Sequence, residues 1–293
     1  MLFLAAFLAL LIGVTLGLLG GGGSILTLPI LVYVLHQDPK EAIAGSLFVV
    51  GTTALVSAIQ HARAGNVDYK RGLIFGAASM AGAFAGGQVA GHLPGNVLLG
   101  AFAAMMLVTS IAMMRPRREP VAGEKHPLFV GRELAAGAGV GLVAGLVGAG
   151  GGFLIVPALV LFGGLDMRRS IGTSLMVLTL QSFAGFAGHV PHTHVNWTLT
   201  AIVTTAAVMG SLVGARLAKR LSVATLRRGF AWFVLAMAVF MIGKQVSLLA
   251  AALTAVVSVA IVLVVQRRRG AHVESPVPSN PKILPNTKVE QNA

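Results

Sequence analysis

The feature that most restricts the fold of this chain is a succession of apolar stretches, each long enough to cross a lipid bilayer. A bilayer core about 30 Å thick requires roughly 20 mostly apolar residues per spanning helix. Alternating strand patterns of the kind found in membrane barrels do not occur in the sequence. The sequence therefore predicts an all-α polytopic membrane protein. Its apolar stretches lie near 1–35, 42–60, 72–91, 96–114, 134–162, 170–188, 197–217, 229–246 and 247–265.

The composition and charge exclude several function classes. Only 11% of the residues are charged, against roughly 25% in soluble domains. The net charge of +13 comes from lysines and arginines in short loops and just after helices, where they act as orientation signals. No aromatic and basic face accompanies them, so nucleic-acid binding is not expected. Without cysteine, the chain has no disulfide, thiolate metal site or cysteine nucleophile.

The chain contains two copies of one unit, which align without a gap when the sequence is shifted by 128 residues. Chance could explain the matched glycines and leucines, but not matched aspartate, histidine and proline in one frame. The sequence thus divides into a first repeat at 1–114, a cytoplasmic linker at 115–133, a second repeat at 134–246, an extra helix at 247–266 and a disordered cytoplasmic tail at 267–293. The matched pairs include Gly17 and Gly145, Gly20 and Gly148, Gly22 and Gly150, Gly23 and Gly151, Pro29 and Pro157, Asp38 and Asp166, Ser46 and Ser174, and His61 and His189.

The basic loops predict how the repeats are oriented. The linker and Arg267 to Arg269 are expected in the cytoplasm, so the C-terminus is cytoplasmic too. For Arg168 and Arg169 also to lie inside, the glycine-containing segment of the second repeat must enter the membrane and turn back. The two repeats then start from opposite faces. We therefore expect inverted-topology repeats, each with a Gly-broken re-entrant or hairpin segment and three transmembrane helices.

The paired glycine segments resemble a known family. GLLGGGGSILTLP at 17–29 and GLVGAGGGFLIVP at 145–157 are each followed by a Ser-Leu pair and then by an N-V-D-Y or V-N-W element. This pattern is similar to that of the sulfite exporter TauE/SafE family. The resemblance covers roughly 1–245 and implies a permease of the bacterial plasma (inner) membrane. It also implies export of sulfite or a small organosulfonate, with no cofactor.

The glycine runs predict two helix breaks that can bind an anion. Glycine disfavours helix and adopts positive φ readily, and a break inside a membrane is tolerated only where backbone is buried in protein or lines a wet cavity. Exposed amides before a helix start attract an anion. Isolated Gly82, Gly86, Gly210 and Gly214 are better explained by close helix packing. The expected binding residues are Gly20, Gly21, Gly22, Gly23 and Ser24 in one repeat and Gly148, Gly150, Gly151 and Gly152 in the other.

Other polar and special residues recur at matching positions of the repeats. Ser46 and Ser174 follow the glycine segments and are expected to offer hydroxyl donors to the anion. His61 and His189 lie at predicted helix ends on opposite faces, either as interfacial histidines or as a proton-linked gate. We expect structural roles for two matched pairs, helix N-capping by Asp38 and Asp166 and bending of the following helix by Pro29 and Pro157. No metal site is expected, since the histidines near His192 lack cysteine or carboxylate partners.

These features together predict a secondary transporter of a small anion, bound near the membrane midplane between the two helix breaks. Neither glycine segment carries the Lys-Ser or Lys-Thr of a nucleotide-binding loop. An anion channel is the first alternative, and a membrane enzyme or structural protein is the second, although no catalytic constellation is recognisable. The expected partners are the substrate anion and the lipid bilayer. The oligomeric state stays open, with a homodimer as one option.

Overall fold

The computed structural model describes residues 2–19, 22–114, 130–148, 151–161, 165, 167–218 and 223–245. Every regular element within these ranges is helical, which confirms the all-α fold class. The extra helix expected at 247–266 and the expected tail at 267–293 lie outside the described residues. The expected linker lies outside them up to residue 129.

The described helices follow one another through short connections. The chain folds into α1 (Leu2–Leu19), η1 (Gly22–Leu26), α2 (Thr27–Pro29), η2 (Ile30–Val34), α3 (Pro39–Arg63), α4 (Tyr69–Gly91), α5 (Gly95–Met114), α6 (Val130–Val147), α7 (Gly152–Leu161), α8 (Met167–His189), η3 (Val190–His192), α9 (Trp197–Ala218) and α10 (Val223–Gln245).

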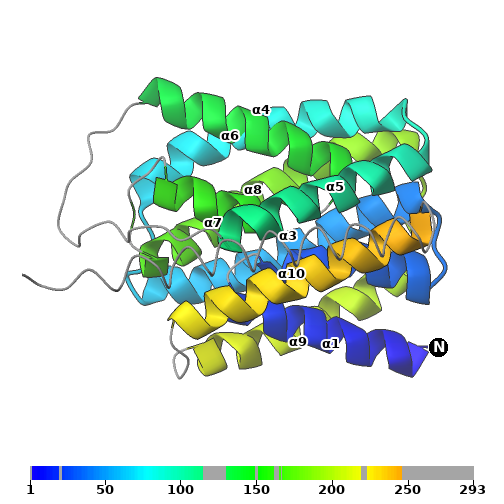
Figure 1. Ribbon diagram of the computed structural model, residues 1–293, viewed down its shortest axis with the longest axis horizontal. Helices are drawn as coiled ribbons and strands as arrows, with labels where there is room; N and C mark the ends of the chain where they lie inside the picture. Colours follow the sequence, from blue (N-terminus) through cyan, green and yellow to red (C-terminus); the bar gives the residue numbers. More distant parts are fainter. Residues whose placement is uncertain are drawn as a thin grey trace, which may run out of the picture.

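Several of these helices are long and apolar enough to cross a membrane. Five candidate spans lie at Pro39–Arg63, Tyr69–Gly91, Val130–Val147, Arg169–His192 and Trp197–Leu217. Shorter apolar helices lie at Leu4–Leu18, Gly23–Val34, Gly95–Ile111 and Val234–Lys244. The helices form one elongated bundle with their axes roughly along its length (Figure 1). The chain is therefore built as a polytopic membrane protein.

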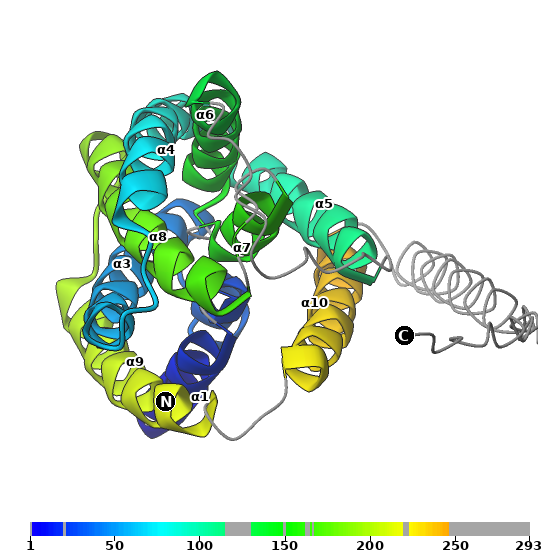
Figure 2. The same cartoon turned by 90° about the vertical axis from the view of Figure 1, so that its left-hand side faces the viewer.

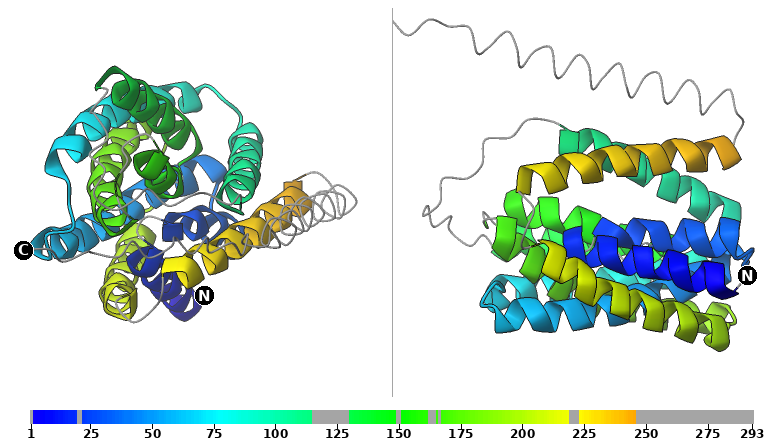
Figure 3. Two further views of the ribbon diagram at one scale, coloured as in Figure 1. Left: turned by 60° about the vertical axis from the view of Figure 1, so that its left-hand side comes forward. Right: turned by 90° about the horizontal axis from the view of Figure 1, so that it is seen from below.

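The first glycine segment breaks the helix and turns the chain back. α1 stops short of the far end of the bundle (Figure 3, right), and η1 packs against its last turns. A side chain on Gly23 would collide with the backbone of Leu16, so only glycine permits this close return. Beyond the turn the helix is irregular, because Pro29 has no amide hydrogen to donate. It continues as the π-helix η2, in which the amide of Leu35 donates to the carbonyl of Ile30 at 3.0 Å.

The second glycine segment turns back in the same way between α6 and α7. Gly148 and Gly151 adopt φ values of +72° and +60°, a left-handed conformation that side chains other than glycine rarely adopt. A Cβ atom on Gly151 would also lie 2.6 Å from the Cβ atom of Ala144. The sequence prediction that helix is abandoned at these glycines is confirmed for the described positions.

Isolated glycines bring other helices into close contact. Side chains at Gly82 and Gly86 of α4 would collide with the backbone of α6, and side chains at Gly210 and Gly214 of α9 would collide with the backbone of α1. Small residues at such crossings let membrane helices approach closely, so the packing role expected for these four glycines is confirmed. Seen along the helices, α7 lies near the middle, with α4 and α6 on one side and α1 and α9 on the other (Figure 2).

Candidate functional site

The two helix breaks of the chain meet inside the bundle. η1 contacts α7, and each is flanked by a long central helix, since η2 contacts α3 and α7 contacts α8. The turn at Gly148 reaches across to the first half of the chain, where a Cβ on that glycine would collide with the side chain of Ile43. Segments more than 100 residues apart in the sequence thus form one structural centre, which is our candidate binding site.

Ser46 connects α3 to the second glycine turn. Its side chain is fully buried, and its hydroxyl lies in hydrogen-bond contact with the carbonyl oxygens of Ile43 and Gly148. A serine hydroxyl has one proton to donate and two lone pairs that accept. In this arrangement the proton is directed to a carbonyl, and the lone pairs of the oxygen face the same region.

Ser174, the matched serine on α8, is also fully buried. Its hydroxyl donates to the carbonyl oxygen of Ile171, one turn earlier, at 2.8 Å. This bond corresponds to the bond of Ser46 with Ile43. The two serines therefore share a local geometry. The partner that corresponds to Gly148 would be Gly20, which lies outside the described residues, as do Gly21 and Gly150.

The start of α7 has the geometry of an anion-binding helix end. The carbonyl oxygen of Gly151 accepts from the amides of Leu154 at 2.8 Å and Ile155 at 3.1 Å, which closes the first turn. The amides of the first residues of a helix, here from Gly152 onward, have no partner within the helix and attract negative charge. Ser24, the matched residue in the first half, is fully buried within η1.

A buried amide beside this turn was not among the predicted site residues. Gln181 of α8 is 1% exposed, and its Oε1 accepts a hydrogen bond from the hydroxyl of Ser79 on α4. This bond directs the Nε2 group of Gln181 to the turn, where it lies 2.9 Å from the position of a Cβ on Gly151. Because the equivalent positions of the other repeat are Thr53 and Ala207, the repeat pattern gave no signal for this pair.

The two predicted histidines lie at opposite ends of the bundle. His61 is in the last turn of α3, and its carbonyl accepts from the amide of Asn66 at 3.0 Å. His189 ends α8, is 3% exposed, and its Nε2 lies 2.8 Å from the carbonyl oxygen of Gly145. His189 therefore ties α8 to α6. Within the described ranges, no group of three or more histidine, aspartate and glutamate side chains is placed to hold a metal ion.

Asp38 has the capping geometry expected from the sequence. Its side chain accepts from the amide of Lys40 at 2.9 Å at the start of α3. Pro29 is buried at the end of α2. Asp166 and the side chain of Pro157 lie outside the described residues.

Comparison with known proteins identifies the family of this chain. Residues 5–241 match the sequence model described as Sulfite exporter TauE/SafE. The chain belongs to the TauE/SafE family. The family consists of membrane transporters rather than enzymes.

Several relatives of this TauE/SafE chain carry names of the same kind. A "Probable membrane transporter protein" of Xylella fastidiosa is 33% identical over 241 residues, which cover 80% of this chain and 92% of that protein. The "Probable membrane transporter protein YunE" of Bacillus subtilis is 30% identical, with 75% and 89% covered. A "Probable membrane transporter protein" of Haemophilus influenzae is 26% identical, with 83% and 100% covered. No solved structure matches. The chain is accordingly a multi-pass membrane protein.

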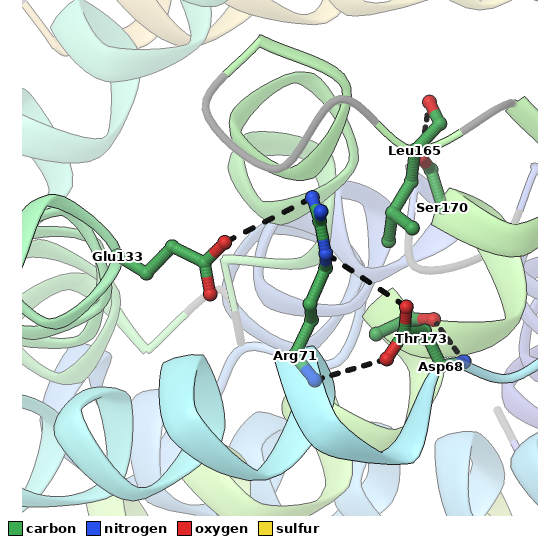
Figure 4. A network of polar contacts seen from close by, with 6 residues as sticks. All are labelled: Asp68, Arg71, Glu133, Leu165, Ser170 and Thr173. Carbon is green, nitrogen blue, oxygen red and sulfur yellow. Dashed lines mark hydrogen bonds and ion pairs between the residues drawn. The ribbon is translucent and has the colours of Figure 1, made fainter. Parts of the chain in front are cut away.

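The TauE/SafE chain also holds a charged cluster that the sequence did not reveal. Arg71 of α4 lies between two carboxylates (Figure 4), with its Nε 3.8 Å from Oδ2 of Asp68 and its Nη1 3.9 Å from Oε1 of Glu133. Asp68 caps α4 by accepting from the amide of Arg71 at 3.0 Å, and its own amide donates to the hydroxyl of Thr173 on α8 at 2.9 Å. Glu133 lies in the first turn of α6, within the stretch expected as linker.

Proposed function

We propose that this chain is a secondary transporter of a small anion, sulfite or an organosulfonate, in the bacterial plasma membrane with its C-terminus in the cytoplasm. The anion is held near the membrane midplane between the two glycine breaks. The observation that carries the proposal is the contact between η1 and α7, since it joins both breaks in one centre. Family membership supports the transport function, and the family description supports sulfite as the first anion to test.

The proposed site rests on inverted repeats, which are supported by the helix boundaries. Four pairs of helices begin 128 residues apart, namely α1 and α6, α3 and α8, α4 and α9, and α5 and α10. The contacts repeat at the same spacing. Gly13 of α1 approaches Ala207 of α9, and Gly141 of α6 approaches Ser79 of α4. This correspondence is expected when a pseudo-twofold axis relates the halves.

The directions of the helices support inversion rather than a parallel repeat. In Figure 1, α1 begins at the right-hand end of the bundle, where the N-terminus is marked, and α6 begins at the left-hand end. Corresponding helices therefore run in opposite directions. Inverted repeats with broken helices are common in secondary transporters, whose substrates bind between the repeats.

The chemistry of the centre favours an anion. Its polar groups include backbone amides at helix starts, the hydroxyls of Ser24, Ser46 and Ser174, and the side-chain amide of Gln181. Among the described residues, no lysine or arginine is fully buried. Small oxyanions are bound at such helix ends by hydrogen bonds and by the helix dipole.

An exchange assay in proteoliposomes tests the proposal. Vesicles loaded with unlabelled sulfite should accumulate labelled sulfite transiently against its gradient, because a carrier returns loaded faster than empty. An anion channel would give downhill flux without this counterflow. The absence of both counterflow and flux, for sulfite and for organosulfonates such as sulfoacetate, would refute the proposed function.

Serine variants test the location of the site. Ser46→Ala and Ser174→Ala should each raise the sulfite concentration that gives half-maximal exchange. Ser110→Ala is the matched control, since the hydroxyl of Ser110 on α5 donates to the carbonyl of Leu107 at 2.8 Å with the same spacing along its helix. If all three variants exchange sulfite like the wild type, the anion does not bind at these serines.

A further inference from the structure

The cluster of Asp68, Arg71 and Glu133 contains a carboxylate that its surroundings only partly satisfy. Glu133 is 2% exposed and is the one acidic side chain among the described residues that is buried. It lies within the apolar span Val130–Val147. Ionisable residues inside membrane segments are energetically costly and usually serve function.

The geometry differs from that of a structural ion pair. A strong arginine–carboxylate pair has hydrogen bonds of about 2.7–2.9 Å, often two in parallel. Here the nearest approach of Glu133 to Arg71 is 3.9 Å. The second carboxylate oxygen, Oε2, has no hydrogen-bond partner in the described part of the chain. Burying a carboxylate in this state is unfavourable while it is charged, and a bound proton removes most of that penalty.

The charge of the cluster points to the same ligand. Arg71 supplies one positive charge and faces two carboxylates, Asp68 and Glu133, and these are the charged side chains that act on Glu133. The three groups carry one net negative charge when all are ionised. One proton on Glu133 makes the cluster neutral and leaves Arg71 paired with Asp68. A metal ion would need several ligating groups, and the described residues offer no such set here.

The cluster also lies where the two halves of the chain meet. Asp68 and Arg71 belong to α4, whereas Glu133 belongs to α6 and Thr173 to α8. The ion pair between Arg71 and Glu133 therefore joins the first half to the second at the end of the bundle where α4 and α6 begin (Figures 1 and 4).

The opposite end of the bundle has no such group at the equivalent positions. The residues 128 positions away from Asp68, Arg71 and Glu133 are Asn196, Leu199 and Ala5. None of them can ionise. A charge change in the cluster thus acts on the contact between the halves at one membrane face alone.

We propose that Glu133 is the proton-binding site that couples transport to a proton gradient, an inference that rests on the proposed anion transport. Ionised Glu133 holds α6 to Arg71 and keeps this face closed. A proton from the aqueous phase on this side converts the carboxylate to the acid, weakens its attraction to Arg71 and allows the halves to separate here. A proton and a singly charged anion that cross together move no net charge.

Uptake driven by a pH gradient tests the coupling. In proteoliposomes, a pH gradient should stimulate sulfite uptake by the wild type, and Glu133→Gln should lose this stimulation. Glu41→Gln is the matched control, because Glu41 lies in the first turn of α3 at the opposite end of the bundle and should keep the response. Wild-type uptake that ignores the pH gradient, uptake driven by sodium instead, or a full response in Glu133→Gln would overturn the proposal.

Infrared spectroscopy tests proton binding without any transported anion. An acid titration of the purified wild type should show the carbonyl stretch of a buried carboxylic acid, which is lost in Glu133→Gln and shifted in Glu133→Asp. A wild-type spectrum without such a band, at every pH at which the protein stays folded, would overturn the assignment of Glu133. If sulfite exchange is absent but the band is present, the proposed substrate fails while the proton site stands.

Discussion

The hydroxyl of Ser46 bonds the carbonyl oxygen of Gly148, so that a helix of the first half of the chain holds the glycine turn of the second. The bond is fully buried, and it fixes a turn whose backbone is left-handed. A carbonyl at such a turn has no regular helix partner of its own, so Ser46 supplies one.

Removing this hydroxyl should destabilise the protein. We expect Ser46→Ala to lower the free energy of unfolding by about 0.5–2 kcal/mol, the range for a buried hydrogen bond between helices in a membrane. Thermal unfolding in detergent measures the effect. The control is Thr205→Ala, since the exposed hydroxyl of Thr205 bonds only its own helix, at the carbonyl of Ala201. Equal melting temperatures for the two variants would contradict the structural role of Ser46.

The positive φ angles at the second turn predict an asymmetry between glycine substitutions. Gly148→Ala and Gly151→Ala should each destabilise the protein by at least about 1–2 kcal/mol, since left-handed backbone is strained for alanine. Gly139→Ala in α6 has open space around its Cβ and should be neutral or slightly stabilising, because alanine favours helix. Thermal unfolding of the three variants tests this order. Wild-type stability of Gly151→Ala would show that the turn is not left-handed.

Ser79 and Gln181 should be energetically coupled. The hydroxyl of Ser79 holds the amide of Gln181 beside the second turn, so Ser79→Ala and Gln181→Leu should not have additive effects on stability. We expect a coupling energy of about 0.5–2 kcal/mol in a double-mutant cycle of unfolding free energies. Replacing Ser79 alone should have the larger functional consequence per atom removed, because it leaves the amide free to rotate away from Gly151. Additivity of the two substitutions would exclude the bond.

The sequence predicted those parts of the fold that depend on local or repeated patterns. Apolar length located the helices, and Asp38 capped α3 as expected. The glycine segments broke the helices because a side chain at Gly23 or Gly151 would collide with the preceding helix. These effects involve residues near one another in the chain, so the sequence alone exposes them.

The polar contacts between distant helices could not be predicted in the same way. Ser79 and Gln181 are 102 residues apart, and neither has a polar match of its own kind in the other repeat. Glu133 follows Arg132, and two adjacent charges favoured a linker over a membrane helix. The helix nonetheless begins at Val130, because α4 offers a guanidinium to the buried carboxylate. Only the packing of α4 against α6 reveals this.

The arrangement of helix ends predicts which loops share a membrane face. The chain has no cysteine, so single-cysteine variants can be labelled with a membrane-impermeant maleimide. Gln37→Cys and His194→Cys should react together, because the loop before α3 and the loop after α8 lie at the same end of the bundle. Ala64→Cys and Arg169→Cys lie at the other end and should react together, and in intact cells only the first pair should be labelled if that face is outside. Labelling of Gln37→Cys and Arg169→Cys from one side would contradict the inverted arrangement, because equivalent loops of inverted repeats must face opposite compartments.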